Sequence, residues 1–146
     1  MSDAPVTPSP PARTWTLAEH AEPVSVVRLP AATALPDWAD GEPLISVTWT
    51  RDETSIVCPS RSIPDALPGS VIGPYVVFQV AGVLDHTLTG VLASLLAPLA
   101  EAEIPILTVA TYDTDWILVP AQHSAAAAAC WTGAGHEVVA AGEVSQ

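Results

Sequence analysis

The feature that most constrains the fold of this chain is an internal repeat at a spacing of 61 residues. Residues 42–59 carry six identities with residues 103–120. The matching pairs are Glu42 and Glu103, Ile45 and Ile106, Thr50 and Thr111, Asp52 and Asp113, Ile56 and Ile117, and Pro59 and Pro120. Because about one identity is expected by chance in a window of this length, the repeat predicts two copies of one supersecondary unit.

Each copy has the pattern of a strand, a polar turn and a second strand. In the first copy, the strands are predicted over Leu44–Thr50 and Thr54–Cys58, with Arg51–Glu53 as the turn and Pro59 as the stop. In the second copy, the strands are predicted over Ile106–Ala110 and Trp116–Val119, around a turn at Thr111–Asp115. Both copies therefore predict a β-hairpin.

The second hairpin lies between two predicted helices. A strand is expected over Tyr75–Val80, opened by Gly73-Pro74, and then a helix over Thr87–Ala102 that Asp85 or Thr87 can cap. Its apolar stripe has helical spacing and continues through a kink at Pro98; the stripe consists of Leu88, Val91, Leu92, Leu95, Leu96 and Leu99. After the hairpin come an Ala-rich helix over Ala121–Thr132, ended by Gly133 and Gly135, and a strand over Glu137–Ala140.

This order of elements is β-α-β-β-α-β, which is typical of a ferredoxin-like sandwich. The first copy is shorter, with a strand over Val24–Leu29 and at most a helical turn at Leu35–Ala39. We therefore predict an α+β fold of tandem ferredoxin-like units, with antiparallel sheets and helices on one face. The expected division is a Pro-rich disordered tail over 1–14, an abbreviated unit over 15–72 and a fuller unit over 73–141.

Charge and motif content exclude several classes of function. The chain has 16 Asp and Glu against 4 Arg and no Lys, a net charge of −12, so binding to nucleic acid or to an anionic membrane is disfavoured. The chain contains no P-loop, no Gly-rich dinucleotide motif and no nucleophile elbow. Its four histidines lack metal-binding spacing. We expect neither an enzyme nor a bound cofactor or metal ion.

The cysteine content and the N-terminal sequence predict the compartment. Cys58 and Cys130 are too few and too distant in sequence for a secreted disulfide framework, so reduced thiols are expected. Residues 1–12 have neither the basic nor the apolar region of a signal peptide, and no segment has the pattern expected of a membrane span. The sequence therefore predicts a cytoplasmic protein.

Three motifs resemble a known family. They are Gly82-x-Leu84-Asp85-x-Thr87-x-x-Gly90-Val91, Pro98-Leu99-Ala100-Glu101-Ala102 before Ile104, and Ala110-Thr111-Tyr112-Asp113-Thr114-Asp115 before Ile117-Leu118-Val119. Together they are similar to the ACT-domain family related to the arginine sensor CASTOR, including its small bacterial members. The resemblance implies an ACT fold that binds an amino acid between two units and acts as a sensor or regulatory module. The sequence departs from the family pattern at His86 and Ala110.

The residues themselves also predict a binding site at the start of the first helix. A loop that enters a helix presents unpaired amide groups and the positive end of the helix dipole, which suits a carboxylate. Gly90 would let a ligand approach the backbone, and the acidic residues at the rim could hold an ammonium or guanidinium group. The expected ligand-binding residues are Asp85, His86, Thr87, Leu88, Thr89, Gly90, Val91, Thr111, Tyr112, Asp113 and Asp115.

Alternative roles stay open for these residues. Asp85 also fits a helix cap, and Asp113 fits a hairpin turn, as its repeat mate Asp52 does. The leading hypothesis is a non-enzymatic module that binds an amino acid, possibly cationic such as arginine, and that forms a homodimer. The sequence does not identify the protein that such a module would regulate. The facing unit could come from the same chain or from a dimer mate. The rival hypothesis is an interaction scaffold that dimerises through sheet edges, with His86 and Tyr112 filling the pocket.

Overall fold

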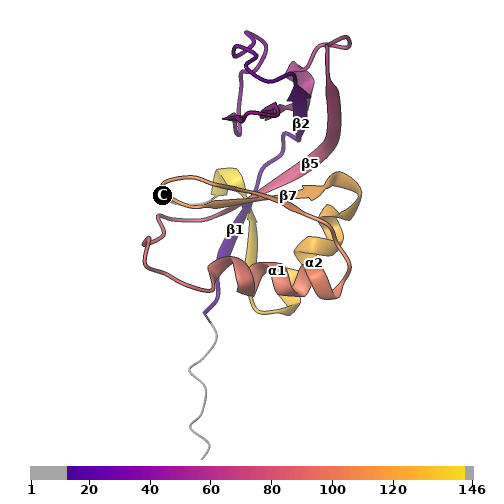
Figure 1. Ribbon diagram of the computed structural model, residues 1–146. Coiled ribbons are helices and arrows are strands. Elements are labelled where there is room, and N and C mark those ends of the chain that lie inside the picture. The colour runs from indigo at the N-terminus through magenta and orange to yellow at the C-terminus, as the bar shows by residue number, and fades with distance from the viewer. Residues whose placement is uncertain (1–12, 144–146) are drawn as a thin grey trace, which may run out of the picture.

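The computed structural model describes residues 13–143, which form a mixed α+β fold (Figure 1). The strands are β1 (Thr16–Glu19), β2 (Val24–Leu29), β3 (Ser46–Trp49), β4 (Thr54–Pro59), β5 (Ser70–Val80), β6 (Leu107–Ala110), β7 (Asp115–Pro120) and β8 (Glu137–Ala140). The α-helices are α1 (Val91–Glu101) and α2 (Ser124–Gly133). The predicted tail over 1–14 lies outside the described residues except for Arg13 and Thr14.

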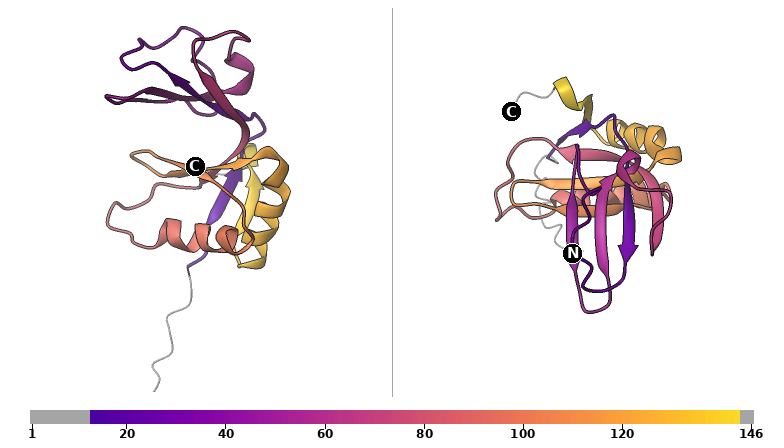
Figure 2. Two further views of the ribbon diagram at one scale, coloured as in Figure 1. Left: turned by 45° about the vertical axis from the view of Figure 1, so that its right-hand side comes forward. Right: turned by 90° about the horizontal axis from the view of Figure 1, so that it is seen from above.

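All eight strands belong to one connected sheet, and β5 is its longest strand. Strands β1 and β2 both pair antiparallel to β5. Strand β1 pairs with its C-terminal end, where Leu17 lies opposite Val80, and β2 pairs with its N-terminal part, where Arg28 lies opposite Ser70. This antiparallel ribbon bends between the two strands, where the register shifts on β2 between Val24 and Val26. Figures 1 and 2 show that the bend separates an upper from a lower part of the molecule.

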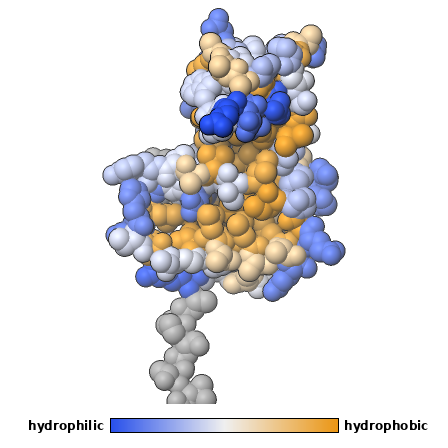
Figure 3. Space-filling model, viewed as in Figure 1, coloured by the Kyte–Doolittle hydropathy of each residue, from blue (hydrophilic) through white to orange (hydrophobic). Residues whose placement is uncertain are grey.

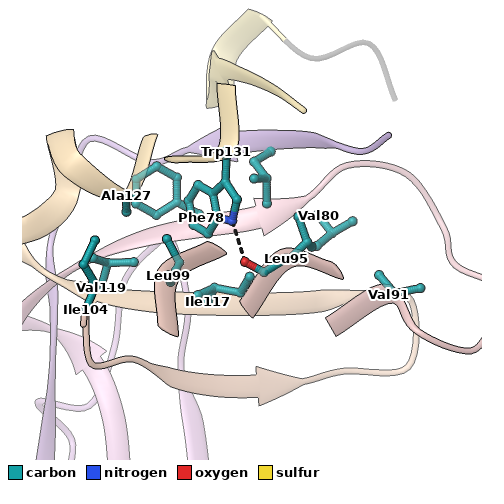
Figure 4. Close-up of a cluster of buried hydrophobic side chains, with 11 residues drawn as sticks. Phe78, Val80, Val91, Leu95, Leu99, Ile104, Ile117, Val119, Ala127 and Trp131 are labelled. Atoms are coloured by element: carbon teal, nitrogen blue, oxygen red, sulfur yellow. Dashed lines mark hydrogen bonds between the residues drawn. The ribbon is translucent and has the colours of Figure 1, made fainter. Parts of the chain in front are cut away.

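We call the lower part the helical half. Its strands follow the order β6-β7-β5-β1-β8, in which β1 pairs antiparallel to β5 and parallel to β8. Helices α1 and α2 cover one face of these strands (Figure 1). Between helices and sheet lies the largest cluster of buried apolar side chains (Figure 4), composed of Leu17, Phe78, Val80, Val91, Leu95, Leu99, Ile104, Ile117, Val119, Ala127 and Trp131.

Trp131 ties the two helices to each other and to the sheet. Its side chain is fully buried, and its indole Nε1 donates a hydrogen bond of 2.8 Å to the carbonyl oxygen of Leu95 in α1. Its ring meets that of Phe78 edge to face, with centroids 4.8 Å apart. Because a buried indole N–H needs a partner, this bond fixes the position of α2 against α1.

The upper part, which we call the small half, contains β2, β3, β4 and the first residues of β5, in the order β3-β4-β2-β5. Instead of α-helices, the described residues 30–45 and 63–69 form turns and irregular chain. Side chains from these segments, including Trp38, Ala39 and Leu67, pack against Val27 and Ile56 of the sheet. A third cluster, which includes Val24, Val57, Val77 and Leu118, joins the inner faces of the two halves.

The internal repeat corresponds to repeated structure. Adding 61 to the bounds of β3 and β4 gives the bounds of β6 and β7, and the short 3₁₀ helices Ser60–Ser62 and Ala121–His123 match in the same way. The turns agree as well: Thr50 N donates to Glu53 O and Thr111 N to Thr114 O, each at 2.9 Å. The two predicted hairpins, the strands 24–29 and 137–140 and the Ala-rich helix are confirmed.

Other expectations need correction. The helix predicted from Thr87 begins at Val91, because Gly90 adopts a left-handed conformation with φ of 77° and the chain before it forms a loop. The strand predicted from Tyr75 begins at Ser70, so Pro74 lies inside the strand and does not start it. The first residues of β5 are exposed, and a residue without an N–H is tolerated there. Segment 35–39, in contrast, agrees with the expectation of at most a helical turn: it is a single turn in which Ala39 N donates to Pro36 O at 3.1 Å.

The prediction of tandem ferredoxin-like units is not confirmed. The small half has no α-helix among the described residues, and its sheet continues into that of the helical half. The expected boundary at 72/73 falls inside β5, and β1, which we placed in the first unit, pairs with β8 at the end of the chain. What holds is the coarser description, a mixed α+β fold with a ferredoxin-like sheet and helices on one face of its helical half.

Candidate functional site

A cavity of about 300 Å³ lies at the start of α1, between the loop that follows β5 and the turn that joins β6 to β7. The loop and the first residues of α1 contribute Leu84, Asp85, His86, Leu88, Gly90, Val91 and Leu92, and the turn contributes Thr111, Tyr112, Asp113, Thr114 and Asp115. The two segments are adjacent because β5 and β7 are neighbours in the sheet. The cavity is large enough for a small organic molecule.

The turn is held in place by its own hydrogen bonds and by β5. Both N and Oγ1 of Thr111 donate to the carbonyl oxygen of Thr114, at 2.9 and 3.0 Å. The hydroxyl of Thr114 is buried and donates to the carbonyl oxygen of Val80 at 2.6 Å. One wall of the cavity is therefore rigidly connected to the end of the central strand.

The loop is attached to this turn and ordered by Asp85. Leu84 N donates to the carbonyl oxygen of Asp113 at 2.7 Å. Oδ1 of Asp85 accepts hydrogen bonds from the hydroxyl and the amide of Thr87, at 2.6 and 2.8 Å, and these bonds lower the pKa of the Asp85 carboxyl. Asp85 thus already acts as a turn residue, and it is an exposed residue that lines the cavity.

The amide groups that can receive a carboxylate lie later in the chain than expected. The first backbone bond of α1 runs from Ser94 N to Gly90 O at 3.0 Å. The preceding amides of Val91, Leu92 and Ala93 therefore form the N-terminus of α1, where the helix dipole is positive. Leu88 N is used by the loop, where it donates to Asp85 O at 3.0 Å.

His86 and Tyr112 bridge the two walls. His86 Nε2 donates to the carbonyl oxygen of Tyr112 at 2.7 Å, and the two rings meet edge to face with centroids 4.6 Å apart. The side of Tyr112 away from His86 is open, since 82% of the residue is exposed. The pair therefore connects the loop wall of the cavity to the turn wall.

The acidic side chains of the turn form no ion pair among the described residues. No Lys or Arg follows Arg61 in the sequence. Within the described part of the chain, the two ion pairs are Arg28 with Glu53 and Arg61 with Glu22, both outside this cavity. The carboxylates of Asp113 and Asp115 are therefore available to a positively charged group.

The structure brings together nine of the eleven residues predicted to bind a ligand. Thr87 and Thr89 do not line the cavity, and the hydroxyl of Thr87 donates to Asp85 instead. Leu84, Leu92 and Thr114 line it and were missed. The first two look like core residues in the sequence, whereas Thr114, a polar residue directly before an apolar strand, carried a signal that could have been used.

Other kinds of site are not apparent in residues 13–143. No group of three or more His, Cys, Asp or Glu side chains in this range could hold a metal ion. None of the helices described is long and apolar enough to cross a membrane. The thiol of Cys58 is fully buried, and this burial raises its pKa to about 11, so it is a poor nucleophile.

Comparison with known proteins supports the fold. The ACT domain family model matches residues 70–130, and a second model, for an N-terminal domain, matches residues 22–66. There is no match among curated proteins. Two solved structures share the fold at low identity. VC0802 of Vibrio cholerae, a protein of unknown function, is 17% identical over 83% of this chain and 90% of its own, with a TM-score of 0.63. The regulatory subunit of aspartate kinase from Thermus flavus is 13% identical over 84% and 99%, with a TM-score of 0.57.

A nearer relative is protein Atu0741 of Agobacterium tumefaciens. Its crystal structure is 32% identical to this chain, covers 88% of it and is itself covered to 95%, with a TM-score of 0.81. Both the sequence and the whole fold are therefore shared over nearly the full length of the two proteins. The chain belongs to the same family as Atu0741, and its residues 70–130 match the ACT domain model.

Proposed function

We propose that this chain is a non-enzymatic sensor module that binds a free amino acid with a cationic side chain in the cavity at the start of α1. The observation that carries the proposal is the juxtaposition of two complementary charges within one cavity. The N-terminus of α1 offers amide groups to a carboxylate, and Asp113 and Asp115 offer acceptors to a positive group. ACT domains are in general regulatory modules for small molecules, which agrees with this role.

The repeat supplies an internal comparison that supports the choice of site. In the small half, Thr54 stands where the helical half has Asp115, and its Oγ1 accepts a hydrogen bond from Thr33 N at 3.2 Å. The indole Nε1 of Trp49 donates to the carbonyl oxygen of Thr33 at 2.7 Å. The chain itself thus occupies the place beside the first turn, whereas the equivalent place beside the second turn is an open cavity.

A titration with amino acids tests the proposal. We expect arginine and lysine to stabilise the protein against thermal unfolding, and citrulline, an uncharged analogue of arginine, to bind more weakly. Ligand at one hundred times its Kd would add about 2.7 kcal/mol to the free energy of unfolding. Glutamate and aspartate should not bind, because their second carboxylate would face the acidic rim.

Matched variants locate the site. Asp115→Asn and Asp113→Asn each remove a charged acceptor and should weaken arginine binding by about tenfold to a hundredfold, as expected for a charge-assisted hydrogen bond. Asp52→Asn changes the repeat mate of Asp113 in the small half and should leave the Kd unchanged. No stabilisation by any of the twenty amino acids, or equal effects of the Asp52 and Asp113 variants, would exclude the proposed ligand site.

A second candidate is an interaction scaffold without a metabolite ligand, and one observation favours it. The hydrogen bond and ring contact between His86 and Tyr112 join the two walls of the cavity directly. If the pair only closes the structure, His86→Ala should destabilise the protein and leave it unresponsive to amino acids. If the pair borders a ligand site, the same variant should change the affinity for arginine.

A further inference from the structure

A second cavity, of about 370 Å³, lies between the two halves, where the hairpin of β3 and β4 faces the hairpin of β6 and β7. Its walls include Ser46, Thr48 and Ser55 of the small half, and Leu107, Val109 and Leu118 of the helical half. It shares none of its lining residues with the cavity at the start of α1, except that Ala110 and Thr111 are neighbours in the chain. We call it the inter-hairpin cleft. Figure 2 shows the two hairpins one above the other, on the same side of the bend.

The two walls of the cleft come from matching positions of the internal repeat. Three pairs of residues 61 positions apart line it: Ser46 and Leu107, Thr48 and Val109, and Val57 and Leu118. Ser46 lies opposite Val57 in its hairpin, as Leu107 lies opposite Leu118. Because side chains alternate between the faces of a strand, these residues share the inner face, while their neighbours Ile56 and Ile117 pack into the cores on the outer faces. The cleft is therefore enclosed by the two copies of the repeat.

The differences between the copies give the cleft one wall with hydroxyl groups and one apolar wall. Serine and threonine at 46 and 48 in the small half are replaced by leucine and valine at 107 and 109 in the helical half. The hydroxyls of the nearby Thr50 and Thr54 take part in hydrogen bonds within the small half. Those of Ser46, Thr48 and Ser55 form none with any group of residues 13–143. Each can both donate and accept, so this wall can bond to an occupant.

Charge determines which class of occupant fits. Of residues 13–143, no charged one lines the cleft. Arg28 pairs with Ser55 across the sheet, but its guanidinium forms an ion pair with Glu53 at 3.2 Å and donates to Asp52 O. An anion would find no free cation in the cleft and would be repelled by the net charge of −12, and a cation would find no carboxylate. The occupant that fits is uncharged.

Apolar contacts between the halves close the cleft at its base. Val57 and Leu118 are buried members of the cluster that joins the two inner faces. Leu107, in contrast, is 37% exposed, and Figure 3 shows apolar residues at the surface where the two halves meet. Burying this apolar surface would stabilise an occupied cleft. Since the walls are two facing layers of side chains that touch at one end, a flat molecule fits between them.

We propose that the inter-hairpin cleft binds a flat, uncharged, largely apolar molecule that carries a hydrogen-bonding group such as an amine or a hydroxyl. The apolar body covers Leu107 and Val109, and the polar group bonds to a hydroxyl of the opposite wall. The volume of the cleft lies within the range of small-molecule sites. This site is separate from the cavity proposed above for an amino acid, so either proposal can fail without the other.

Two fluorescent probes with the same ring system test the proposal on the full chain. N-phenyl-1-naphthylamine is uncharged and has one N–H group, and its emission rises in apolar surroundings. 8-Anilinonaphthalene-1-sulfonate differs from it by an added sulfonate. We expect the first probe to bind saturably and the second to bind at least about tenfold more weakly, because the sulfonate finds no cation in the cleft. Excess arginine should not displace the first probe, and Asp113→Asn should leave its dissociation constant unchanged.

Variants of the two walls locate the bound probe. Ser46→Leu copies the repeat mate Leu107 and fills the cleft, and should raise the dissociation constant of N-phenyl-1-naphthylamine at least about tenfold. Ser70→Leu is the matched control, since Ser70 is an exposed serine of the small half outside the cleft. It should leave the dissociation constant within about twofold. The double variant Thr48→Val, Ser55→Ala removes two hydroxyls without adding volume and should raise the constant by about threefold to tenfold.

The outcomes separate the proposal from its alternatives. Absence of saturable binding of N-phenyl-1-naphthylamine overturns it, as does equal binding of the two probes. Unchanged affinity in both Ser46→Leu and the double variant, each with the circular dichroism of the unmodified chain, also overturns it, because the probe would then bind elsewhere. Displacement by arginine would assign the probe to the cavity at the start of α1 and contradict a separate site.

Discussion

Replacing Thr114 by valine measures how firmly the turn of the candidate site is fixed to the central strand. The side chain is 4% exposed, and its hydroxyl donates to Val80 O at 2.6 Å. Valine has nearly the same volume, so the packing stays while the carbonyl of Val80 loses this donor in a buried place. The cost of an unsatisfied buried acceptor is about 1–3 kcal/mol, and we expect the free energy of unfolding to fall by about 2 kcal/mol.

Thr132→Val is the matched control for this substitution. Its hydroxyl also donates to a backbone carbonyl, that of Ala128, but Thr132 is exposed, so water can replace the lost bond. The expected change is less than about 0.5 kcal/mol. Urea unfolding followed by tryptophan fluorescence gives both values, with unchanged m-values if only the folded state is affected. Equal stabilities of the two variants would refute the assignment of the Thr114 hydroxyl as a structural tie.

Three further predictions concern the core and the bend. Gly73→Ala should destabilise the protein by about 2 kcal/mol or more, because φ at this position is 134° and the new Cβ would lie 2.6 Å from Ser25 Oγ; thermal unfolding checks it. At pH 8, a thiol reagent should modify Cys130 in the folded protein, and Cys58 only on unfolding, because burial raises the Cys58 pKa to about 11; mass spectrometry after timed alkylation distinguishes the two. Trp131→Phe should cost about 1–3 kcal/mol in chemical unfolding, since it removes the indole donor and part of the core volume.

Strands that depend on their own residues could be predicted from the sequence, whereas strands that depend on pairing with distant segments could not. Strand β4, at 54–59, follows from a short apolar run that ends in proline, and its bounds depend little on the rest of the chain. Strand β1 was missed because the sequence Thr-Leu-Ala-Glu has little strand propensity. It is a strand because β5 and β8 pair with it on both sides, which no local pattern reveals.

The start of α1 illustrates a competition between two local signals. Leu88 continues the leucine stripe of the helix and does pack against the core, so the spacing indicated a helix from Thr87. Gly90 takes a left-handed conformation instead, and the Asp85 turn gives the preceding residues another set of hydrogen bonds. Periodicity located the buried side chain correctly and assigned the wrong backbone conformation to it.

The sequence predicted the charged groups of the candidate site, but it did not predict the contacts between the residues. The acidic turn could be placed near the helix start because the repeat fixed the hairpin and the order of elements fixed its neighbour. The bond between His86 and Tyr112 joins residues 26 positions apart and depends on how two loops meet. The inter-hairpin cleft likewise depends on how the two halves pack.

The pairing of β1 and β2 with β5 determines which truncated forms of this protein can keep their sheet. Because β1 and the end of β5 are antiparallel neighbours, they form the two arms of a hairpin into which residues 20–74 have been inserted. A fragment limited to the ACT match, 70–130, would therefore lack both β1 and β8 and lose two adjacent strands of its sheet. Excision of the small half is better designed as an internal deletion, with a short turn rejoining Glu19 to Tyr75 and both ends of the chain retained.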